Sequence, residues 1–178
     1  VVVGSGVGAK WSDLMLHSNA YWCLGRKTDG TLWTWGNNSW GTLGQNNPAW
    51  QSSPIQIGTD TNWSRNFSSS FTQAAIKTDG TLWTWGQNEN GSLGLNNQGP
   101  YNGGLLTSVS SPTQLGTETN WKYISVGGNS RVRTYMIGTK TDGTLWYWGK
   151  SGNYGGDGLN GSGKTPGNAN TGGVFKSS

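Results

Sequence analysis

The chain of 178 residues is poor in both hydrophobic (31%) and charged (11%) residues, yet it contains 12 Trp, 6 Tyr and 3 Phe. So many aromatic side chains exclude a disordered chain, which combines few aromatic residues with a high net charge, and they predict a core made of few, large side chains. The net charge of +4 is spread along the sequence, whereas a nucleic-acid-binding surface needs a concentrated basic stripe, so we expect no nucleic-acid partner.

The residue types that build several other kinds of site are scarce. Cys23 is the only cysteine, so the chain cannot belong to the small proteins held together by intrachain disulfides. With one cysteine and one histidine, His17, no metal site and no cofactor are expected. No apolar run approaches the roughly 20 residues of a membrane-spanning helix, so we expect no membrane span.

The first elements along the chain are short. Val1-Val2-Val3-Gly4 looks like the middle of a repeated unit, so we expect either a part of a longer chain or several copies that assemble. Leu14-Met15-Leu16 is compatible with a short helix or with a short strand.

A ten-residue stretch organises the sequence. It reads Lys-Thr-Asp-Gly-Thr-Leu-Trp-Thr-Trp-Gly at 27–36, returns unchanged at 77–86, and returns at 140–149 with Tyr147 in place of the middle Thr. The Asp-Gly pair predicts a two-residue hairpin turn. The strand that follows alternates with period two, so Trp33 and Trp35 share one face and neither face is polar. The sequence thus predicts strands covered on both faces, with the indole rings in the core.

Five positions of this stretch are expected to be structural, and its last glycine should end the strand or admit a neighbouring backbone. These positions are Asp29, Gly30, Trp33, Trp35 and Gly36, with their equivalents Asp79, Gly80, Trp83, Trp85, Gly86, Asp142, Gly143, Trp146, Trp148 and Gly149.

The spacing of the stretch defines three units. Lys27 and Lys77 are 50 residues apart, and the next interval is 63. The extra residues fall before Pro112 and around Gly127-Gly128-Asn129-Ser130, which predicts surface loops there. Buried strands are predicted at 74–76 and 136–137, and the tail at 149–178 fits a long loop with a closing strand or a partly flexible segment.

Units of about 50 residues with several short strands and no helical periodicity are typical of a β-propeller. We therefore predict one all-β domain over residues 1–178, with three blades at approximately 1–50, 51–108 and 109–178.

The loops after each Trp-Gly differ between units, while the framework stays constant. Variable loops on a constant scaffold are where recognition usually lies, and Asn amides beside an aromatic plane suit hydroxyl-rich ligands, although Asn and Gly also simply make turns. The candidate ligand-binding residues are Asn37, Asn38, Trp40, Asn88, Glu89, Asn90, Asn153 and Tyr154.

Catalysis is harder to derive from the sequence, because a catalytic site needs a titratable group held near a second one. The aspartates of the turns have a backbone role, and Asp60 and Glu118 occupy equivalent positions, which indicates a structural role for both. We predict a protein that is not an enzyme. A pair of carboxylates that includes Glu89 or Asp157 would be needed for the opposite case.

The repeat resembles that of the RCC1 (regulator of chromosome condensation) family. The similarity lies in Pro-x-Gln-Ile-Gly, then a hydrophobic strand, then Asp-Gly-Thr-Leu-Trp-x-Trp-Gly-x-Asn-x-x-Gly-x-Leu-Gly, and is best at 54–94. The resemblance implies a seven-bladed propeller, of which about three blades are present, and is closest to bacterial and phage-type versions. The family's usual His, seven residues ahead of the Asp, is replaced by Trp22, Thr72 and Tyr135.

The resemblance and the polar, Asn-rich composition favour a non-enzymatic interaction or structural module. We expect a surface or adhesion component of a phage virion or bacterial surface, extracellular or virion-bound, whose partners are proteins or further copies or blades of itself. A carbohydrate-binding propeller, with glycans as ligands, is the first alternative. A regulator of a small GTPase, as in the eukaryotic founder of the family, is the second, although no residue here carries that activity over.

Overall fold

The computed structural model describes residues 8–16, 21–68, 71–88, 91–95, 108–130, 133–150 and 162–168. Within them, twelve strands form three antiparallel sheets of four. The first sheet contains β1 (Trp11–Leu16), β2 (Trp22–Lys27), β3 (Leu32–Gly36) and β4 (Gln51–Gln56). The second contains β5 (Trp63–Ser68), β6 (Thr72–Lys77), β7 (Leu82–Gln87) and β8 (Ser108–Gln114). The third contains β9 (Trp121–Ser130), β10 (Arg133–Lys140), β11 (Leu145–Lys150) and β12 (Ser162–Asn168).

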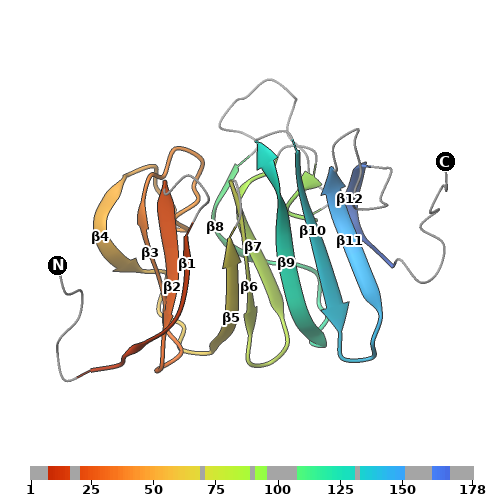
Figure 1. Cartoon of the computed structure of the whole chain (residues 1–178), viewed down its shortest axis with the longest axis horizontal. Helices are drawn as coiled ribbons and strands as arrows, with labels where there is room; N and C mark the ends of the chain where they lie inside the picture. Colours follow the sequence, from red (N-terminus) through yellow and green to blue (C-terminus); the bar gives the residue numbers. More distant parts are fainter. Residues whose placement is uncertain are drawn as a thin grey trace.

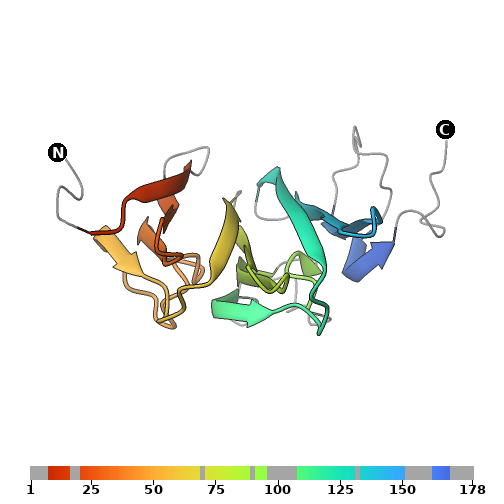
Figure 2. The ribbon, with the colours of Figure 1, turned by 90° about the horizontal axis from the view of Figure 1, so that it is seen from below.

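Each sheet is a meander in which consecutive strands pair. The three sheets stand side by side (Figure 1) and follow an arc, with β1, β5 and β9 on its concave side and β4, β8 and β12 on its convex side (Figure 2). The predicted all-β architecture of three repeated units is confirmed.

Each of the first two sheets ends later in the chain than the unit boundaries expected near residues 50 and 108. Strand β4 pairs with β3 through Trp33 and Gln56, so residues 51–56 close the first sheet, and β8 closes the second in the same way. The chain crosses to the next sheet at 57–62 and again at 115–120. A periodic sequence sets the length of the unit but not the point at which one sheet ends, and this explains the shift of one strand.

The Asp-Gly turns contain three residues instead of the predicted two. In the first turn, the Gly30 N–H donates to the Lys27 carbonyl (3.0 Å) and the Lys27 N–H donates to the Thr31 carbonyl (3.0 Å). Gly30 has a φ of +81°, whereas Asp29 does not enter the left-handed region. The result is a three-residue loop that ends in a left-handed glycine, and the Asp side chain is left for another task.

The same turn joins one sheet to the next. The Trp63 N–H, at the start of the second sheet, donates to the Gly30 carbonyl (3.1 Å), and Trp121 N–H bonds to Gly80 in the same way (3.1 Å). A Cβ on Gly30 would collide with the carbonyl oxygen of Thr61. Glycine is therefore required both for its positive φ and for the close approach of the crossing chain.

Two kinds of sheet face alternate along the arc. The Trp face of the first sheet consists of Trp11, Trp33 and Trp35. The ring centres of Trp33 and Trp35 lie 6.2 and 5.7 Å from that of Trp11. The Leu face of that sheet consists of Leu24 and Leu32, both at most 1% exposed. Equivalent positions define the same faces in the other sheets.

The apolar core lies between the sheets, where a Leu face meets the Trp face of the next sheet. Leu24, Leu32 and Ile57 pack against Trp63 and Trp85 between the first two sheets. A second cluster joins the next two sheets, and its members are Ala74, Ile76, Leu82, Leu115, Trp121, Ile124, Met136 and Trp148. The prediction of strands at 74–76 and 136–137 is confirmed, as is the packing of indole rings in the core.

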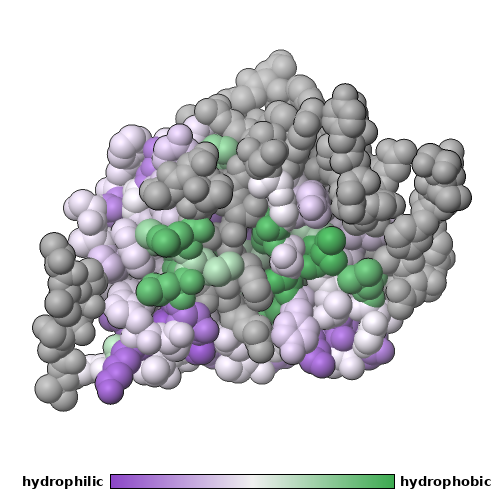
Figure 3. Space-filling model, viewed as in Figure 1, coloured by the Kyte–Doolittle hydropathy of each residue, from purple (hydrophilic) through white to green (hydrophobic). Residues whose placement is uncertain are grey.

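The concave side carries apolar side chains as well. Figure 3 shows them gathered across the middle of this side, with hydrophilic residues below. Leu14 and Leu16 of β1 are 59% and 71% exposed, and Tyr123 of β9 is 45% exposed. Leu14-Met15-Leu16, which fitted either a helix or a strand, is part of strand β1.

One predicted loop is a strand. Residues Gly127 to Ser130 extend β9 to ten residues and pair with β10 up to Arg133. The glycines indicated a loop because they are poor strand formers, but a Cβ on Gly127 would collide with the ring of Tyr135, so a large cross-strand neighbour uses the space. The other insertion, before Pro112, lies mostly outside the described residues. In the tail, the closing strand is present as β12.

Candidate functional site

The Asp, Thr and Trp of each repeat form a hydrogen-bonded chain. The Thr31 N–H and hydroxyl both donate to Asp29 Oδ1 (3.0 and 2.6 Å), and the Trp33 indole N–H donates to Thr31 Oγ1 (2.7 Å). The hydrogen bonds from the Thr31 side chain and backbone hold the pKa of Asp29 below its ordinary value. The same contacts recur in the other units, at Asp79–Thr81–Trp83 and Asp142–Thr144–Trp146.

The lysine of each repeat lies against the indoles that this chain of hydrogen bonds orients. Lys77 Nζ is 3.9 Å from the centre of the Trp83 ring and 4.8 Å from that of Trp63, and it pairs with Asp60 Oδ2 at 2.8 Å. Such cation–π contacts contribute about 0.5–2 kcal/mol each. The ten-residue stretch is thus a packing unit: its lysine, aspartate, threonine and first tryptophan hold one another.

The three lysines differ in their acidic partners. Lys140 pairs with Glu118 and lies 3.5 Å from the Trp146 ring, as the equivalence of Glu118 and Asp60 suggests. Lys27 lies 3.7 Å from the Trp33 ring, but Gly8 occupies the position equivalent to Asp60.

Two of the candidate ligand-binding residues are buried inside their own loops. The Asn38 side chain is fully buried; its Oδ1 accepts the Leu43 N–H (2.9 Å) and its amide N–H donates to the Asn47 carbonyl. Asn88 is 3% exposed and its Oδ1 accepts the Leu93 N–H (3.0 Å). These amides shape the loop that follows each Trp-Gly and have no exposed surface to offer a ligand.

The other candidates are less uniform. Asn37 Oδ1 accepts the Ser39 N–H (2.8 Å), which makes a local turn. Trp40 is half-buried and its ring lies 4.9 Å from that of Phe71, the residue that precedes β6 of the neighbouring sheet, so this side chain also belongs to the junction between sheets. Glu89, Asn90, Asn153 and Tyr154, together with Asp157 and His17, lie outside the described residues.

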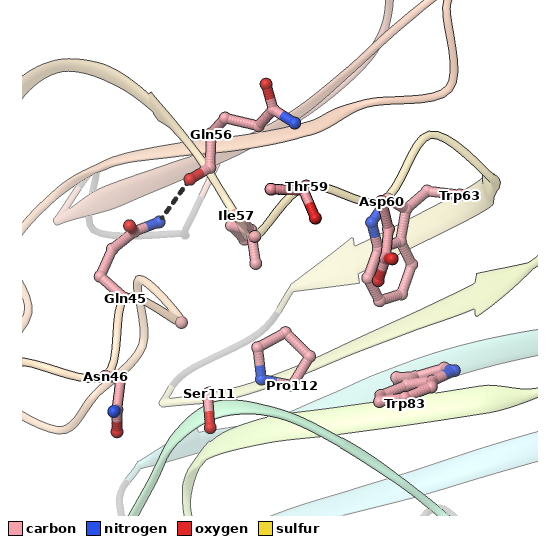
Figure 4. A pocket seen from close by; sticks show the side chains of 12 residues that line it. Gln45, Asn46, Gln56, Ile57, Thr59, Asp60, Trp63, Trp83, Ser111 and Pro112 are labelled. Carbon is pink, nitrogen blue, oxygen red and sulfur yellow. Dashed lines mark hydrogen bonds between the residues drawn. The ribbon is translucent and has the colours of Figure 1, made fainter.

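A cleft between the first and second sheets is the site that sequence reasoning missed (Figure 4). It has a volume of about 520 Å³. One wall is formed by residues 44–46 of the loop after β3 and by residues 56–60 of the crossing segment. The other is formed by Trp83 of β7 and by Ser111 and Pro112 of β8. No sequence signal marks this cleft, because its residues come from four separate segments.

The cleft combines an indole with polar groups. Asp60 is half-exposed, Gln56 is half-buried and Thr59 is exposed. Gln45 donates to the Gln56 carbonyl (3.1 Å), which joins the loop to β4. The arrangement is suited to binding and orienting a polar ligand against an aromatic surface.

Other functional groups were sought across the described residues. They contain no group of three or more His, Cys, Asp or Glu side chains able to hold a metal ion, and no helix among them is long and apolar enough to cross a membrane. Cys23 is a free, half-buried thiol, and burial raises its pKa.

Three antiparallel sheets packed face to face along an arc are the blades of a partial β-propeller. The family model described as "Regulator of chromosome condensation (RCC1) repeat" matches residues 29–75 and 79–132. The chain therefore belongs to the RCC1 repeat family.

Solved structures give the same fold. Human WBSCR16 is 18% identical, with a TM-score of 0.71 over 93% of this chain and 39% of its own. Prp20p from Saccharomyces cerevisiae is 19% identical, with a TM-score of 0.66 over 83% of this chain and 36% of its own. Yeast RCC1 (Prp20) bound to Kap60 is 18% identical, with a TM-score of 0.57 over 72% of this chain and 30% of its own. The chain thus spans well under half the length of these propellers. A comparison with curated proteins gives no match.

Proposed function

We propose that the chain is a non-enzymatic interaction module that binds a further RCC1-type blade through its first sheet. The observation that carries this proposal is the unequal burial of equivalent tryptophans. Trp63 and Trp85 of the second sheet are 1% and 0% exposed, and Trp121 and Trp148 of the third are 3% and 0% exposed. Trp11 and Trp35, at the same places in the first sheet, are only half-buried.

The opposite end of the arc offers the matching face. Leu32 and Thr34 of the first sheet are fully buried, but their equivalents in the third sheet, Leu145 and Tyr147, are half-buried. A Leu face already packs on a Trp face twice within this chain. The partner that suits the open Trp face is therefore a Leu face, supplied by another copy of the chain or by another blade.

The setting we propose is a bacterial surface or a virion, with the module as a surface or adhesion component. What supports it is the Asn-rich, nearly cysteine-free composition and the resemblance to bacterial and phage-type repeats. Prp20p binds Gsp1p and histones, and yeast RCC1 binds Kap60. We carry over to this chain only the general property of binding proteins, and neither those partners nor the regulation of a small GTPase.

Sedimentation velocity over a wide concentration range tests the proposal. We expect species heavier than the 19.0 kDa monomer as the concentration rises. Trp35→Glu and Leu145→Glu should each stop this assembly, because each places a charge on one of the two faces. An equimolar mixture of the two variants should form dimers and nothing larger, because one intact face of each kind remains.

The control is Trp50→Glu, at a loop residue that is 68% exposed, which should assemble as the wild type does. Circular dichroism verifies that each variant is folded. A wild-type chain that stays monomeric throughout would refute another copy of the chain as the partner. A mixture of the two face variants that stays monomeric while the wild type assembles would refute the pairing of the Trp face with the Leu face.

Carbohydrate binding is the second candidate function. The cleft of Figure 4 favours it, because an indole and several hydrogen-bonding side chains share one hollow. The residues that support this function are therefore those of the cleft.

A further inference from the structure

The cleft between the first two sheets contains polar side chains that can meet a ligand. Within the described part of the chain, the Thr59 hydroxyl makes no hydrogen bond to the protein, although Thr59 lines the cleft. The half-exposed carboxylate of Asp60 lines it as well and pairs with Lys77 through Oδ2. A hydroxyl offers one donor and an acceptor, and a carboxylate accepts, so these groups can bind the hydroxyls of a ligand.

The walls that present these groups are held in place. Asn46 N–H donates to the Ser110 carbonyl (2.7 Å), and the Ser110 hydroxyl donates to Asn46 Oδ1 (3.3 Å), so the loop of the first sheet is tied to β8 of the second. The Trp83 indole N–H is fixed by Thr81 (2.9 Å). A ligand would meet a preformed site with little ordering cost.

The charge of the cleft selects a neutral ligand. Asp60 is the one charged side chain among the described residues that line it, and the Lys77 ammonium compensates that charge at 2.8 Å. The same ammonium already lies 3.9 Å from the Trp83 ring, so a cationic ligand would be repelled from this indole. An anion finds no uncompensated positive group.

We propose that this cleft is a saccharide-binding site, in which Trp83 supplies an apolar surface and Thr59 and Asp60 bind sugar hydroxyls. Figure 4 shows Thr59, Asp60 and Trp83 around one hollow, with Gln45 bound to the backbone carbonyl of Gln56 on the far side from Trp83. The inference rests on the second candidate function, carbohydrate binding, and assigns that function to the cleft between the first two sheets.

The junction of the second and third sheets provides a natural control. Leu95 replaces Gln45 and packs against the apolar cluster. The equivalent threonine, Thr117, is exposed like Thr59. The second junction therefore has an equivalent threonine but lacks the polar side chain that Gln45 supplies at the first.

The experiment uses an array of defined bacterial surface glycans with the whole chain, followed by calorimetric titration of the saccharide that binds best. Thr59→Ala should weaken binding by about three- to tenfold, which is the loss of one hydrogen bond. Thr117→Ala should bind as the wild type does. Both substitutions are outside the buried core, and thermal unfolding verifies the fold.

The outcomes separate the function from the place. If no glycan binds the wild type, carbohydrate binding itself is refuted. If a glycan binds the Thr59 variant as well as it binds the wild type, carbohydrate binding stands and this cleft is refuted as its site. Equal losses in the Thr59 and Thr117 variants would also refute the assignment, because the effect would then not be specific to this cleft.

Discussion

Three tryptophans at one position of the repeat provide a direct test of how the sheets are held together. Trp85 is fully buried, and its indole N–H donates to the carbonyl of Thr42, which lies in the loop after the first sheet (3.0 Å). Trp148 is also fully buried, but its indole N–H has no partner among the described residues. Trp35 is half-buried. The perturbation is Trp→Phe at each position.

The structure predicts unequal costs. Phe at position 85 removes the hydrogen bond to Thr42 and leaves a buried carbonyl unpaired, which costs about 1–2 kcal/mol. The smaller ring adds roughly 1 kcal/mol of lost burial, for a total of about 2–3 kcal/mol. Trp148→Phe loses burial but also removes an unpaired donor, so its net cost should be about 1 kcal/mol or less. Trp35→Phe should cost less than about 1 kcal/mol, because less surface is buried there.

The assay is urea unfolding followed by far-ultraviolet circular dichroism, at a concentration where the chain is monomeric. Circular dichroism is preferable to fluorescence because 12 tryptophans contribute to the emission. Equal costs at positions 85 and 148 would show that the hydrogen bond to Thr42 contributes nothing. A larger cost at position 35 than at 85 would refute the view that the Trp face of the first sheet is open.

The remaining predictions concern the turn, the core and the lysine. Gly80→Ala should destabilise by about 3 kcal/mol or more, since its Cβ would meet a carbonyl oxygen of the crossing segment, whereas Gly116→Ala, also at positive φ but with open space around it, should cost about 1 kcal/mol. Gln73→Met should stabilise by about 1 kcal/mol, because both amide atoms of this fully buried side chain lack partners among the described residues. Lys77→Met should cost about 1–2 kcal/mol and Lys27→Met less, because only the former removes an ion pair. Urea unfolding measures the stability of the glycine pair, the lysine pair and the Gln73 variant. A reversed order of costs within either pair, or a Gln73→Met variant less stable than the wild type, would contradict the reasoning.

The sequence was sufficient for the strands and for the placement of the indoles because both depend on local periodicity. The alternation of Trp33 and Trp35 with Leu32 identifies two apolar faces, and the exact repeat shows that the arrangement recurs. The boundaries between the units were predicted one strand too early, because a periodic pattern does not say which strand ends a sheet. The length of the Asp-Gly turn was also misjudged, because the side chain of Asp29 bonds to Thr31 instead of the backbone adopting a two-residue turn.

The site was predicted less well, and the reason lies in the asparagines. Asn38 and Asn88 suggested ligand contacts by residue type, yet both are buried and bonded to their own loops. Residue type alone does not distinguish an amide that shapes a loop from one that meets a ligand. The cleft could not be found from the sequence because Gln56, Thr59 and Trp83 are neighbours only after two sheets have packed.

The repeat itself indicates where specificity can reside. Every residue of the ten-residue stretch that the structure explains serves the turn, the orientation of an indole or the joining of sheets, so substitution there would disturb the framework before it altered recognition. Positions that differ between units without such a role are free to carry recognition. Gln45 and Leu95 are one such pair: they occupy equivalent places at the two junctions, and one is polar and braces the cleft while the other is apolar and packs in the core. Differences of this kind let one framework present unlike clefts, so a change of ligand requires no change in the stretch that holds the sheets together.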